Sequence, residues 1–437
     1  MFEFLDGYIN FINNRGIDEI FIMCWHFFVF EFSKYIVLFF VVFLFYYVFQ
    51  KEYTLKLKEW AKGKLYREYP LISVIVPGKN EGKNIYKLVQ SLKNQTYQNY
   101  ELIIVDDGSD DDTAKICKDL LDSKLIDKFI SNPHRGGKAS AANTALKFSR
   151  GKYVVHLDAD SHLKDNAIEE IILPFYMYDN IGAVGGDVRI NNVEASIVTA
   201  LQGIEYLKSI TVGRFVADKM DIMRLISGAF GAFRMDVLKR LGGWDVGPGL
   251  DGDITLKIRK LGFDVTFAID SICYTNAPTK FKALAKQRFR WDRSIIRFRL
   301  RKHINILLNK NFKLPLKLAI IDNIAYNAIF DIFWMIYIYF VITEYTANIG
   351  YILLTNYLLY VIDNYFKFGL IIYFLGDTFR KKDYLGVLYL PLIPLYTGVF
   401  LRLVRIYAHF MEYFFRVSYY DRWNPWKVSR VVKQKGI

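Results

Sequence analysis

The sequence predicts an α/β domain with a mostly parallel sheet and helices on both faces, joined to helices that span a membrane. Two observations support this prediction. Between residues 71 and 275, short β-branched runs alternate with helical patterns, which is typical of parallel sheets. Apolar runs lie on both sides of this region, and ~20 such residues are enough to cross a bilayer.

The first apolar run predicts one membrane crossing near residues 28–50. Residues 36–49 carry no charge, and Glu31 and Lys34 would lie at the membrane interface. An earlier and shorter span at 20–30 stays open as an alternative. The basic block at 51–67 favours a cytosolic location for the region that follows, because basic residues flank spans on the cytosolic side.

Three further apolar stretches close the chain, at 316–343, 349–376 and 384–411. Charged side chains inside a span are costly and usually face other helices or a water-filled path. We expect this of the aspartates that interrupt the stretches, namely Asp322, Asp331 and Asp363. The last stretch would cross the membrane, re-enter it or lie at its surface, because it contains Pro391, Pro394, Arg402 and Arg405.

The net charge of +14, from 58 basic and 44 acidic residues, would suit a nucleic-acid partner, but its distribution favours a membrane. Much of the excess lies at 51–67 and 280–313, beside apolar stretches, where anionic lipids attract basic residues. We therefore expect membrane lipids and no nucleic acid as partners. Three distant cysteines predict free thiols rather than disulfides or a zinc site: Cys24, Cys117 and Cys273.

Polar residues follow three of the predicted strands, at 71–77, 101–107 and 152–158, where ligands bind in sheets of this kind. The strands end in PGKNEG, DDGS and DAD, respectively. Asp158 and Asp160 in the third motif are suited to a divalent cation that bridges phosphates. The turn HRGGK at 134–138 offers cations and a flexible backbone to an anion, just before a helix.

Taken singly, these signals are weak. An Asp-x-Asp occurs in many loops, and DDGSDDD could be a solvated turn that caps the next helix. Their order at three successive strand ends favours a nucleotide site. The common dinucleotide and nucleoside-triphosphate motifs are excluded, because no G-x-G-x-x-G follows the first strand and the sequence has no P-loop.

Together the motifs resemble those of family-2 glycosyltransferases of the GT-A fold. The similar branch is the membrane branch of cellulose, chitin, hyaluronan and poly-N-acetylglucosamine synthases. Gln287, Arg290 and Trp291 match its specific Q-x-x-R-W motif, and SGAFGAFR at 227–234 is similar to its acceptor-side segment. The resemblance covers residues about 70–292 and implies a metal-dependent hexosyltransferase or N-acetylhexosaminyltransferase.

The resemblance implies six nucleotide-binding residues: Pro77, Glu81, Asp107, Lys138, Asp158 and Arg290. The first two would border the nucleoside pocket, the third would bind the uracil or ribose, and the lysine would lie along the nucleotide. The arginine would face the phosphate oxygens. Asp158 and Asp160 would bind Mg2+ or Mn2+, and this cation would hold the diphosphate.

The catalytic aspartate of the family matches Asp251, which would take the proton of the acceptor hydroxyl. Asp253 is the fallback, because Leu250 stands where the family has Glu. Four residues would contact the acceptor: Ser227, Gly228, Gln287 and Trp291. Gln287, Arg290 and Trp291 share one helix face, and the alternative is that Trp291 only anchors a basic helix at the membrane surface.

Three residues outside these motifs carry weaker expectations. We expect Asp187, after a glycine pair, in a solvated turn rather than at the acceptor. For Trp244, packing in the core is at least as well supported as ligand contact. His162 follows Asp160 and is an additional candidate ligand of the cation.

The expected segments are a membrane segment (1–52), a cytosolic GT-A domain (53–279), amphipathic interface helices (280–315), transmembrane helices (316–411) and a basic tail (412–437). The predicted function is inverting transfer of a hexose or N-acetylhexosamine from a nucleotide-sugar, expected to be a UDP-sugar, to a growing glycan at the cell membrane. One alternative is transfer of a single sugar to a polyprenyl phosphate or other lipid acceptor. The other is a transporter or channel whose soluble domain senses nucleotide.

Overall fold

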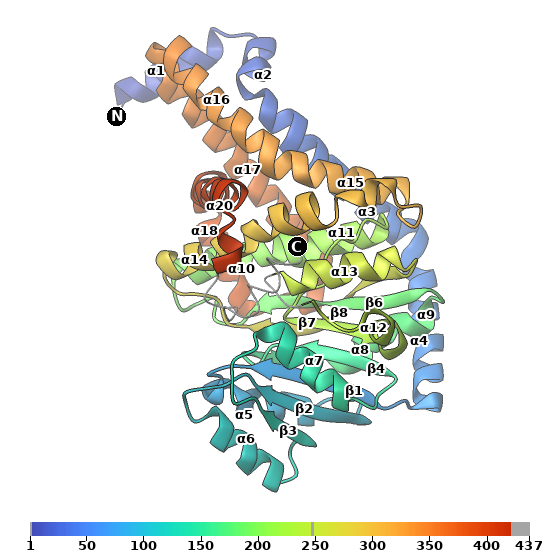
Figure 1. Cartoon of the computed structure of the whole chain (residues 1–437). Helices are drawn as coiled ribbons and strands as arrows, with labels where there is room; N and C mark the ends of the chain where they lie inside the picture. The colour runs from blue at the N-terminus through green and yellow to red at the C-terminus, as the bar shows by residue number, and fades with distance from the viewer. Residues whose placement is uncertain (1, 246–248, 421–437) are drawn as a thin grey trace.

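The computed structural model describes residues 2–245 and 249–420, in which one sheet lies below a bundle of apolar helices (Figure 1). The strands of this sheet are β1 (Ile72–Gly78), β2 (Tyr100–Asp106), β3 (Lys128–Ser131), β4 (Tyr153–Leu157), β5 (Ser161–Leu163), β6 (Ile181–Ile190), β7 (Phe230–Arg234) and β8 (Asp264–Thr275).

The strand order is β3-β2-β1-β4-β7-β6-β8-β5. The first four strands run parallel, and β6 and β8 form another parallel pair. In contrast, β7 is antiparallel to both β4 and β6, and β5 is antiparallel to β8. The predicted α/β class is therefore confirmed, with a parallel first half and a mixed second half.

Helices cover both faces of the sheet. Successive side chains of a strand point to opposite faces, so the apolar side chains of these strands form a core on each face. One core includes side chains of α4 (Lys51–Glu68), α5 (Gly82–Lys93), α6 (Thr113–Asp122), α8 (Ala167–Ile172) and α9 (Pro174–Met177). The opposite core includes side chains of α7 (Lys138–Phe148), α10 (Ile197–Tyr206), η3 (Leu207–Val212), α11 (Gly213–Lys219), α12 (Met235–Leu241) and α13 (Leu250–Lys260). This second core also contains Phe368 and Ile393 of the apolar bundle, so the sheet domain packs directly against it.

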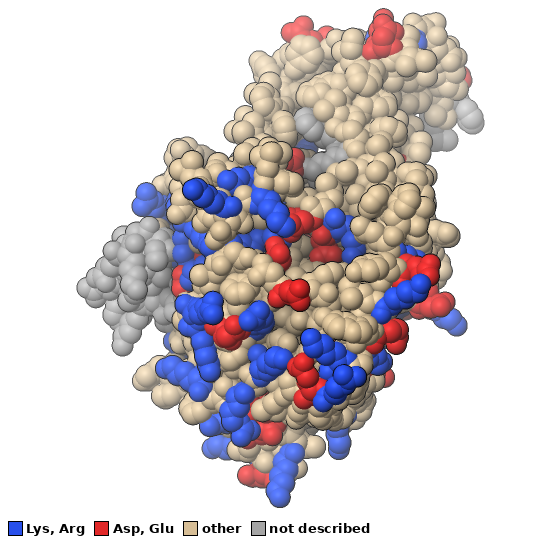
Figure 2. Space-filling view, turned by 90° about the vertical axis from the view of Figure 1, so that its right-hand side faces the viewer, with Lys and Arg blue, Asp and Glu red and all other residues tan. Residues whose placement is uncertain are grey.

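Among the described residues, four helical stretches are long and apolar enough to cross a membrane: Glu31–Glu68, Leu314–Glu344, Thr346–Thr378 and Lys381–Phe415. They coincide with the four predicted apolar runs. Figure 2 shows that acidic and basic side chains cover the lower part of the molecule and are nearly absent from most of the part above it. This division of charge is what a bilayer around the bundle requires.

The bundle consists of the N-terminal helices and those that follow residue 313. The N-terminal elements are α1 (Phe2–Asn13), α2 (Ile17–His26), η1 (Phe27–Val37), α3 (Leu38–Phe45) and η2 (Tyr46–Gln50). The later ones are α15 (Leu314–Ile324), η6 (Ala325–Ile329), α16 (Phe330–Glu344), η7 (Thr346–Asn348), α17 (Ile349–Leu375), η8 (Gly376–Thr378), η9 (Lys381–Leu385), α18 (Gly386–Tyr389), η10 (Leu390–Leu392), α19 (Ile393–Leu395), η11 (Tyr396–Leu401), α20 (Arg402–Phe415) and η12 (Val417–Tyr420).

Buried carboxylates in the bundle are paired with cations. Arg405 donates two hydrogen bonds to Asp331, at 2.7 and 2.8 Å. Lys367 lies 2.8 Å from Asp363 and 2.6 Å from Glu31. All three aspartates of these stretches were expected to face other helices or a water-filled path. Asp331 and Asp363 are buried among helices, whereas Asp322 is exposed at the molecular surface.

The segment between the sheet and the bundle contains α14 (Phe281–Ser294), η4 (Ile295–Lys302) and η5 (Ile304–Leu308). The last helix, α20, lies along it: the Phe289 and Tyr407 rings are 5.5 Å apart, and Arg301 donates to Glu412 at 2.8 Å. The predicted boundary at 411/412 falls inside α20. Residues 421–437 of the predicted basic tail lie outside the described residues.

Asp187 does not lie in a solvated turn, so that expectation is wrong. It is fully buried inside β6, which continues to Ile190. Its carboxylate accepts a hydrogen bond from Arg189 at 2.7 Å and another from the Thr211 hydroxyl at 2.7 Å. These partners offset the cost of burying the charge. Arg189 lies two residues along the same strand, whereas Thr211 comes from η3, and a local pattern does not place it there.

Candidate active site

The polar turns that follow β1, β2 and β4 lie together at one edge of the sheet. In the parallel β1–β2 pair Gly78 lies beside Asp106, so the turns that follow these two strands begin next to each other at the same edge of the sheet. A side chain added at Gly78 would approach that of Ala159 to 3.1 Å, so the third turn lies against the first. Pro77 is buried in β1 and leads directly into this edge.

Asp107 fixes the turn that precedes α7. Its Oδ1 accepts a hydrogen bond from the Gly136 amide at 2.7 Å, and its Oδ2 accepts one from the Gly137 amide at 2.8 Å. Gly137 has a φ of +87°, which glycine adopts without steric cost. Asp107 is 4% exposed, so it positions the start of α7, and its direct contact with a nucleoside stays a prediction.

Lys138, the first residue of α7, links the turn after β4 to the segment before β7. Its Nζ forms an ion pair with Asp158 and donates a hydrogen bond to the Gly228 carbonyl at 2.9 Å. The Gly228 amide in turn donates to Asp251 Oδ2 at 3.3 Å. A continuous line of polar contacts therefore joins the DAD motif to the predicted catalytic aspartate.

Glu81, Asp158 and Asp160 form an acidic group beside this line. Burial raises the pKa of Glu81 to about 7, against the lowering effect of a hydrogen bond from Asn84. The charges of Asp160 and Asp158 raise it further. Burial, followed by the Asp158 charge, raises the pKa of Asp160 to about 6. Because neighbouring carboxylates repel one another, a cation among them would be stabilised.

The available ligands fit a cation that is shared with a substrate. Within residues 2–245 and 249–420, no group of three or more His, Cys, Asp or Glu side chains is arranged to hold a metal ion. Asp158 and Asp160 provide carboxylate oxygens, and a diphosphate and water would complete the oxygen shell that Mg2+ takes at nucleotide sites. The His162 ring packs 5.3 Å from the Tyr274 ring in the β5–β8 pair.

Asp251 and Asp253 lie in the first turn of α13 in different surroundings. Asp251 is half-buried and faces Gly228. Asp253 is buried, accepts a hydrogen bond from His303 at 2.7 Å, and lies 2.7 Å from Lys302. Burial acts to raise the pKa of Asp253, but the His303 hydrogen bond and the Lys302 charge hold it well below its ordinary value. Asp253 therefore ties α13 to the interface segment.

The predicted acceptor residues come from two elements. Ser227 and Gly228 line a small cavity together with His156, Trp244 and Asp251. Gln287, Arg290 and Trp291 lie on α14, where Trp291 is 42% exposed. The continuation of α14 reaches the start of α13, as shown by the Phe298 ring, which a side chain added at Gly249 would overlap.

Trp244 is buried, as the packing interpretation expects. Its ring lies 5.5 Å from the Phe233 ring and 5.6 Å from the His156 ring. Its backbone amide donates a hydrogen bond to Asn143 Oδ1 at 2.9 Å, which fixes the turn that carries the ring. Trp244 therefore forms part of the wall behind the small cavity.

Sequence reasoning passed over Arg214 in α11. Its Nη1 is buried and has no hydrogen-bond partner among the described residues. Burial lowers the pKa of Arg214, while the Asp251 and Asp187 charges oppose this effect. A guanidinium thus lies within electrostatic range of the predicted base. No motif marks it, because α11 and α13 are brought together only by the fold.

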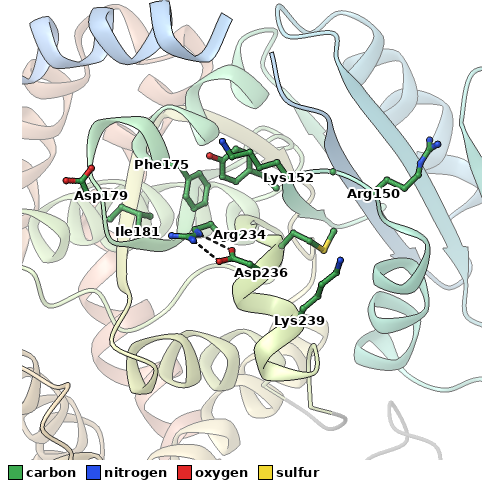
Figure 3. A pocket seen from close by; sticks show the side chains of 11 residues that line it. Arg150, Lys152, Phe175, Asp179, Ile181, Arg234, Asp236 and Lys239 are labelled. Atoms are coloured by element: carbon green, nitrogen blue, oxygen red, sulfur yellow. Dashed lines mark hydrogen bonds and ion pairs between the residues drawn. The ribbon is translucent and has the colours of Figure 1, made fainter. Parts of the chain in front are cut away.

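A second hollow, of about 680 Å3, lies away from these residues (Figure 3). It is formed at the start of β4 and the end of β7, and Arg234 and Asp236 form two hydrogen bonds there, at 3.0 and 2.7 Å. None of the predicted site residues lines it.

Residues 73–242 match the family model for glycosyl transferase family 2. The chain is 28% identical over 368 residues to the poly-beta-1,6-N-acetyl-D-glucosamine synthase of Staphylococcus epidermidis, covering 80% of this chain and 85% of that protein. It is 27% identical over 284 residues to the probable glycosyltransferase YdaM of Bacillus subtilis, covering 63% of each. The mannosyltransferase PcManGT of Pyrobaculum calidifontis, solved with GDP-Man and Mn2+, matches with a TM-score of 0.52 at 17% identity, covering 82% of this chain and 96% of that one.

The family match and the fold together define a chain that has a glycosyltransferase domain with a GT-A-like sheet, joined to apolar helices long enough to span a membrane. More specifically, the chain carries a glycosyl transferase family 2 domain and is related to polysaccharide synthases. The predicted resemblance to family-2 glycosyltransferases is therefore confirmed for the domain at residues 73–242, whereas the Q-x-x-R-W motif at 287–291 lies outside this match.

Proposed function

We propose that the protein transfers N-acetylglucosamine, or a related hexose, from a UDP-sugar to a growing polysaccharide at the membrane. One observation carries this proposal: Lys138 links Asp158 to Gly228, and Gly228 contacts Asp251. The candidate donor-binding and base residues are thus joined by direct contacts. N-acetylglucosamine is the first sugar to test, because it is the unit named in the polysaccharide synthase of Staphylococcus epidermidis.

Asp158 and Asp160 would hold Mg2+ or Mn2+ against the donor diphosphate. When bound, the cation would neutralise the charge that the leaving UDP gains in the transition state. Lys138 lies close enough to Asp158 to exchange this carboxylate for a phosphate oxygen. Glu81, with a pKa raised to about 7, would lose its proton as positive charge enters the cluster.

Asp251 would act as the general base. It would accept the proton of an acceptor hydroxyl as that oxygen forms a bond to the anomeric carbon and the carbon–phosphate oxygen bond breaks. Attack from the face opposite the leaving group inverts the anomeric configuration, so an α-linked donor gives a β-linked product. Asp253 is a weaker candidate, because His303 and Lys302 already engage its carboxylate.

Trp291 would stack on the acceptor sugar, since its indole is 42% exposed on α14. Elongation of a polysaccharide is favoured over transfer to a lipid, because the relative that covers 80% of this chain is a polysaccharide synthase. A purely nucleotide-sensing transporter is not favoured, because the chain carries a glycosyltransferase domain.

We further propose that the catalytic domain faces the cytosol of a cell-membrane protein. The first span continues into the basic helix α4, which carries the positive charge that cytosolic flanks favour. Nucleotide-sugars are cytosolic metabolites in ordinary cells, so this orientation would give the cleft access to its donor.

The test is UDP release from labelled UDP-sugars by the purified full chain with Mn2+ and with a glycan acceptor. We expect Asp160→Asn and Asp251→Asn each to lower the rate about 100-fold or more, as loss of a charge-stabilising or basic group does. Asp236→Asn, at the distant hollow, is the control and should stay within about twofold. Undiminished UDP release by the combined Asp160→Asn and Asp251→Asn variant would refute the mechanism.

A further inference from the structure

One carboxylate joins three elements that are far apart in the sequence. Glu205, near the end of α10, receives a two-pronged contact from Arg288 of α14, with both nitrogen–oxygen distances 2.9 Å. The hydroxyl of Tyr396, in η11, donates to the same carboxylate at 2.7 Å. Glu205 thus connects the sheet domain with α14, called here the interface helix, and with the last apolar stretch, Lys381–Phe415, called here the last membrane segment.

Arg288 also contacts the aromatic residue of the Q-x-x-R-W motif. Its guanidinium carbon lies 4.5 Å from the centre of the Trp291 ring, three residues along the same helix. A guanidinium over an indole is attracted by the ring electrons. Because Glu205 fixes the guanidinium of Arg288, and this guanidinium contacts the indole of Trp291, Glu205 constrains the orientation of the indole without touching it.

The surroundings favour a role in orientation over a role in attachment. The Arg288 and Glu205 side chains are only 12% and 16% exposed, and a two-pronged ion pair is strong and directional where water is scarce. The interface helix has other anchors to the last membrane segment, including the Phe281–Phe400 and Phe289–Tyr407 ring contacts. Loss of the ion pair should therefore loosen the indole without detaching the helix.

We propose that Glu205 is a positioning residue for acceptor binding, which orients Trp291 through Arg288 and sets its place relative to the last membrane segment through Tyr396. The motif leaves the residue at position 288 unspecified, so neither partner of the pair is assigned by it. The inference rests on the proposed function, in which Trp291 stacks on the acceptor sugar.

The experiment measures polymer formation at increasing acceptor concentration by the full chain, alongside UDP release without acceptor and UDP-sugar binding. For Glu205→Gln and Arg288→Ala we expect the acceptor KM to rise about tenfold, as loss of a charged hydrogen-bond pair predicts. Acceptor-free UDP release and donor binding should stay within about twofold. The double variant should lose less than the sum of the two single changes, because both changes remove the contact between Glu205 and Arg288.

Two further variants make the result specific. Glu205→Asp, which keeps the charge, should recover part of the acceptor affinity. Asp236→Asn removes another two-pronged ion pair, with Arg234, far from the cleft, and should leave the acceptor KM unchanged. A general loss of stability would instead lower all three readouts together in Glu205→Gln.

The inference is overturned if Glu205→Gln loses donor binding and acceptor use in parallel, or if its acceptor KM matches that of Asp236→Asn. If the wild-type protein still releases UDP and forms polymer, either of these outcomes overturns this inference alone and leaves the proposed function intact. A wild-type protein that releases no UDP from any nucleotide-sugar would overturn the proposed function and this inference with it.

Discussion

Lys138 forms an ion pair with Asp158 inside the cleft where the donor diphosphate is proposed to bind. The lysine is held there by the first turn of α7, which Asp107 fixes through two backbone amides. A cation on a positioned helix start is suited to a phosphate group. This relationship leads to the first prediction.

Lys138→Ala should weaken UDP binding about 10- to 100-fold, the range for losing a charged hydrogen bond. The measurement is isothermal titration of UDP with Mn2+. Lys147→Ala, an exposed change at the other end of the same helix, is the control and should bind UDP like the wild type. Equal affinities for all three proteins would remove Lys138 from the nucleotide site.

Cation affinity should rise with pH. Burial is the main reason that the pKa of Asp160 is raised to about 6 and that of Glu81 to about 7. A raised carboxyl pKa means that the proton is still bound in mildly acidic solution and competes with the metal. Mn2+ affinity should therefore increase between about pH 5 and about pH 8 and then level off. Asp160→Asn should flatten this rise, and a pH-independent wild type would contradict the prediction.

Asp253→Asn should destabilise the protein, whereas Asp251→Asn should not. Breaking the buried contact of Asp253 with His303 and Lys302 should cost about 3 kcal/mol of unfolding free energy, seen as a lower Tm. Because the pKa of Asp253 is lowered on folding, its stabilisation is complete at neutral pH and is lost as the pH falls below about 4. Asp251→Asn should lose transfer activity at an unchanged Tm, and the reverse pattern would exchange the two roles.

Trp291→Ala should abolish elongation while nucleotide binding stays nearly intact. The indole is exposed on α14, and its loss removes a stacking surface rather than a phosphate contact. Trp291→Phe should retain part of the activity because it keeps an aromatic face. Product length measured by gel and UDP affinity measured in parallel test this, and equal loss of both would make Trp291 structural.

The sequence was most informative where function depends on local order. DDGS and DAD follow strands directly, and parallel strands bring their ends to one edge, so the meeting of these turns could be expected. The apolar runs predicted the four helices that are long and apolar enough to cross a membrane for the same reason, since hydrophobicity along one helix is a local property.

Long-range partners were the part that could not be predicted. Asp187 was expected in a solvated turn, because its sequence does not show that β6 continues past it or that Thr211 of η3 donates to its carboxylate. The sequence also made Asp253 a catalytic candidate, because it does not show that His303, fifty residues later, forms a hydrogen bond with the Asp253 carboxylate. Glu205 belongs to none of the sequence motifs. Its proposed role follows only from its contacts with Arg288 and Tyr396, which lie on other helices far along the chain.

The most direct test of the account is to locate a Mn2+ ion by its anomalous scattering in crystals of the protein with UDP. The account predicts one Mn2+ in contact with the carboxylates of Asp158 or Asp160 and with the diphosphate, and Lys138 moved from Asp158 toward a phosphate oxygen. Nucleotide and Mn2+ bound instead in the hollow lined by Arg234 and Asp236, with the DAD turn untouched, would contradict it.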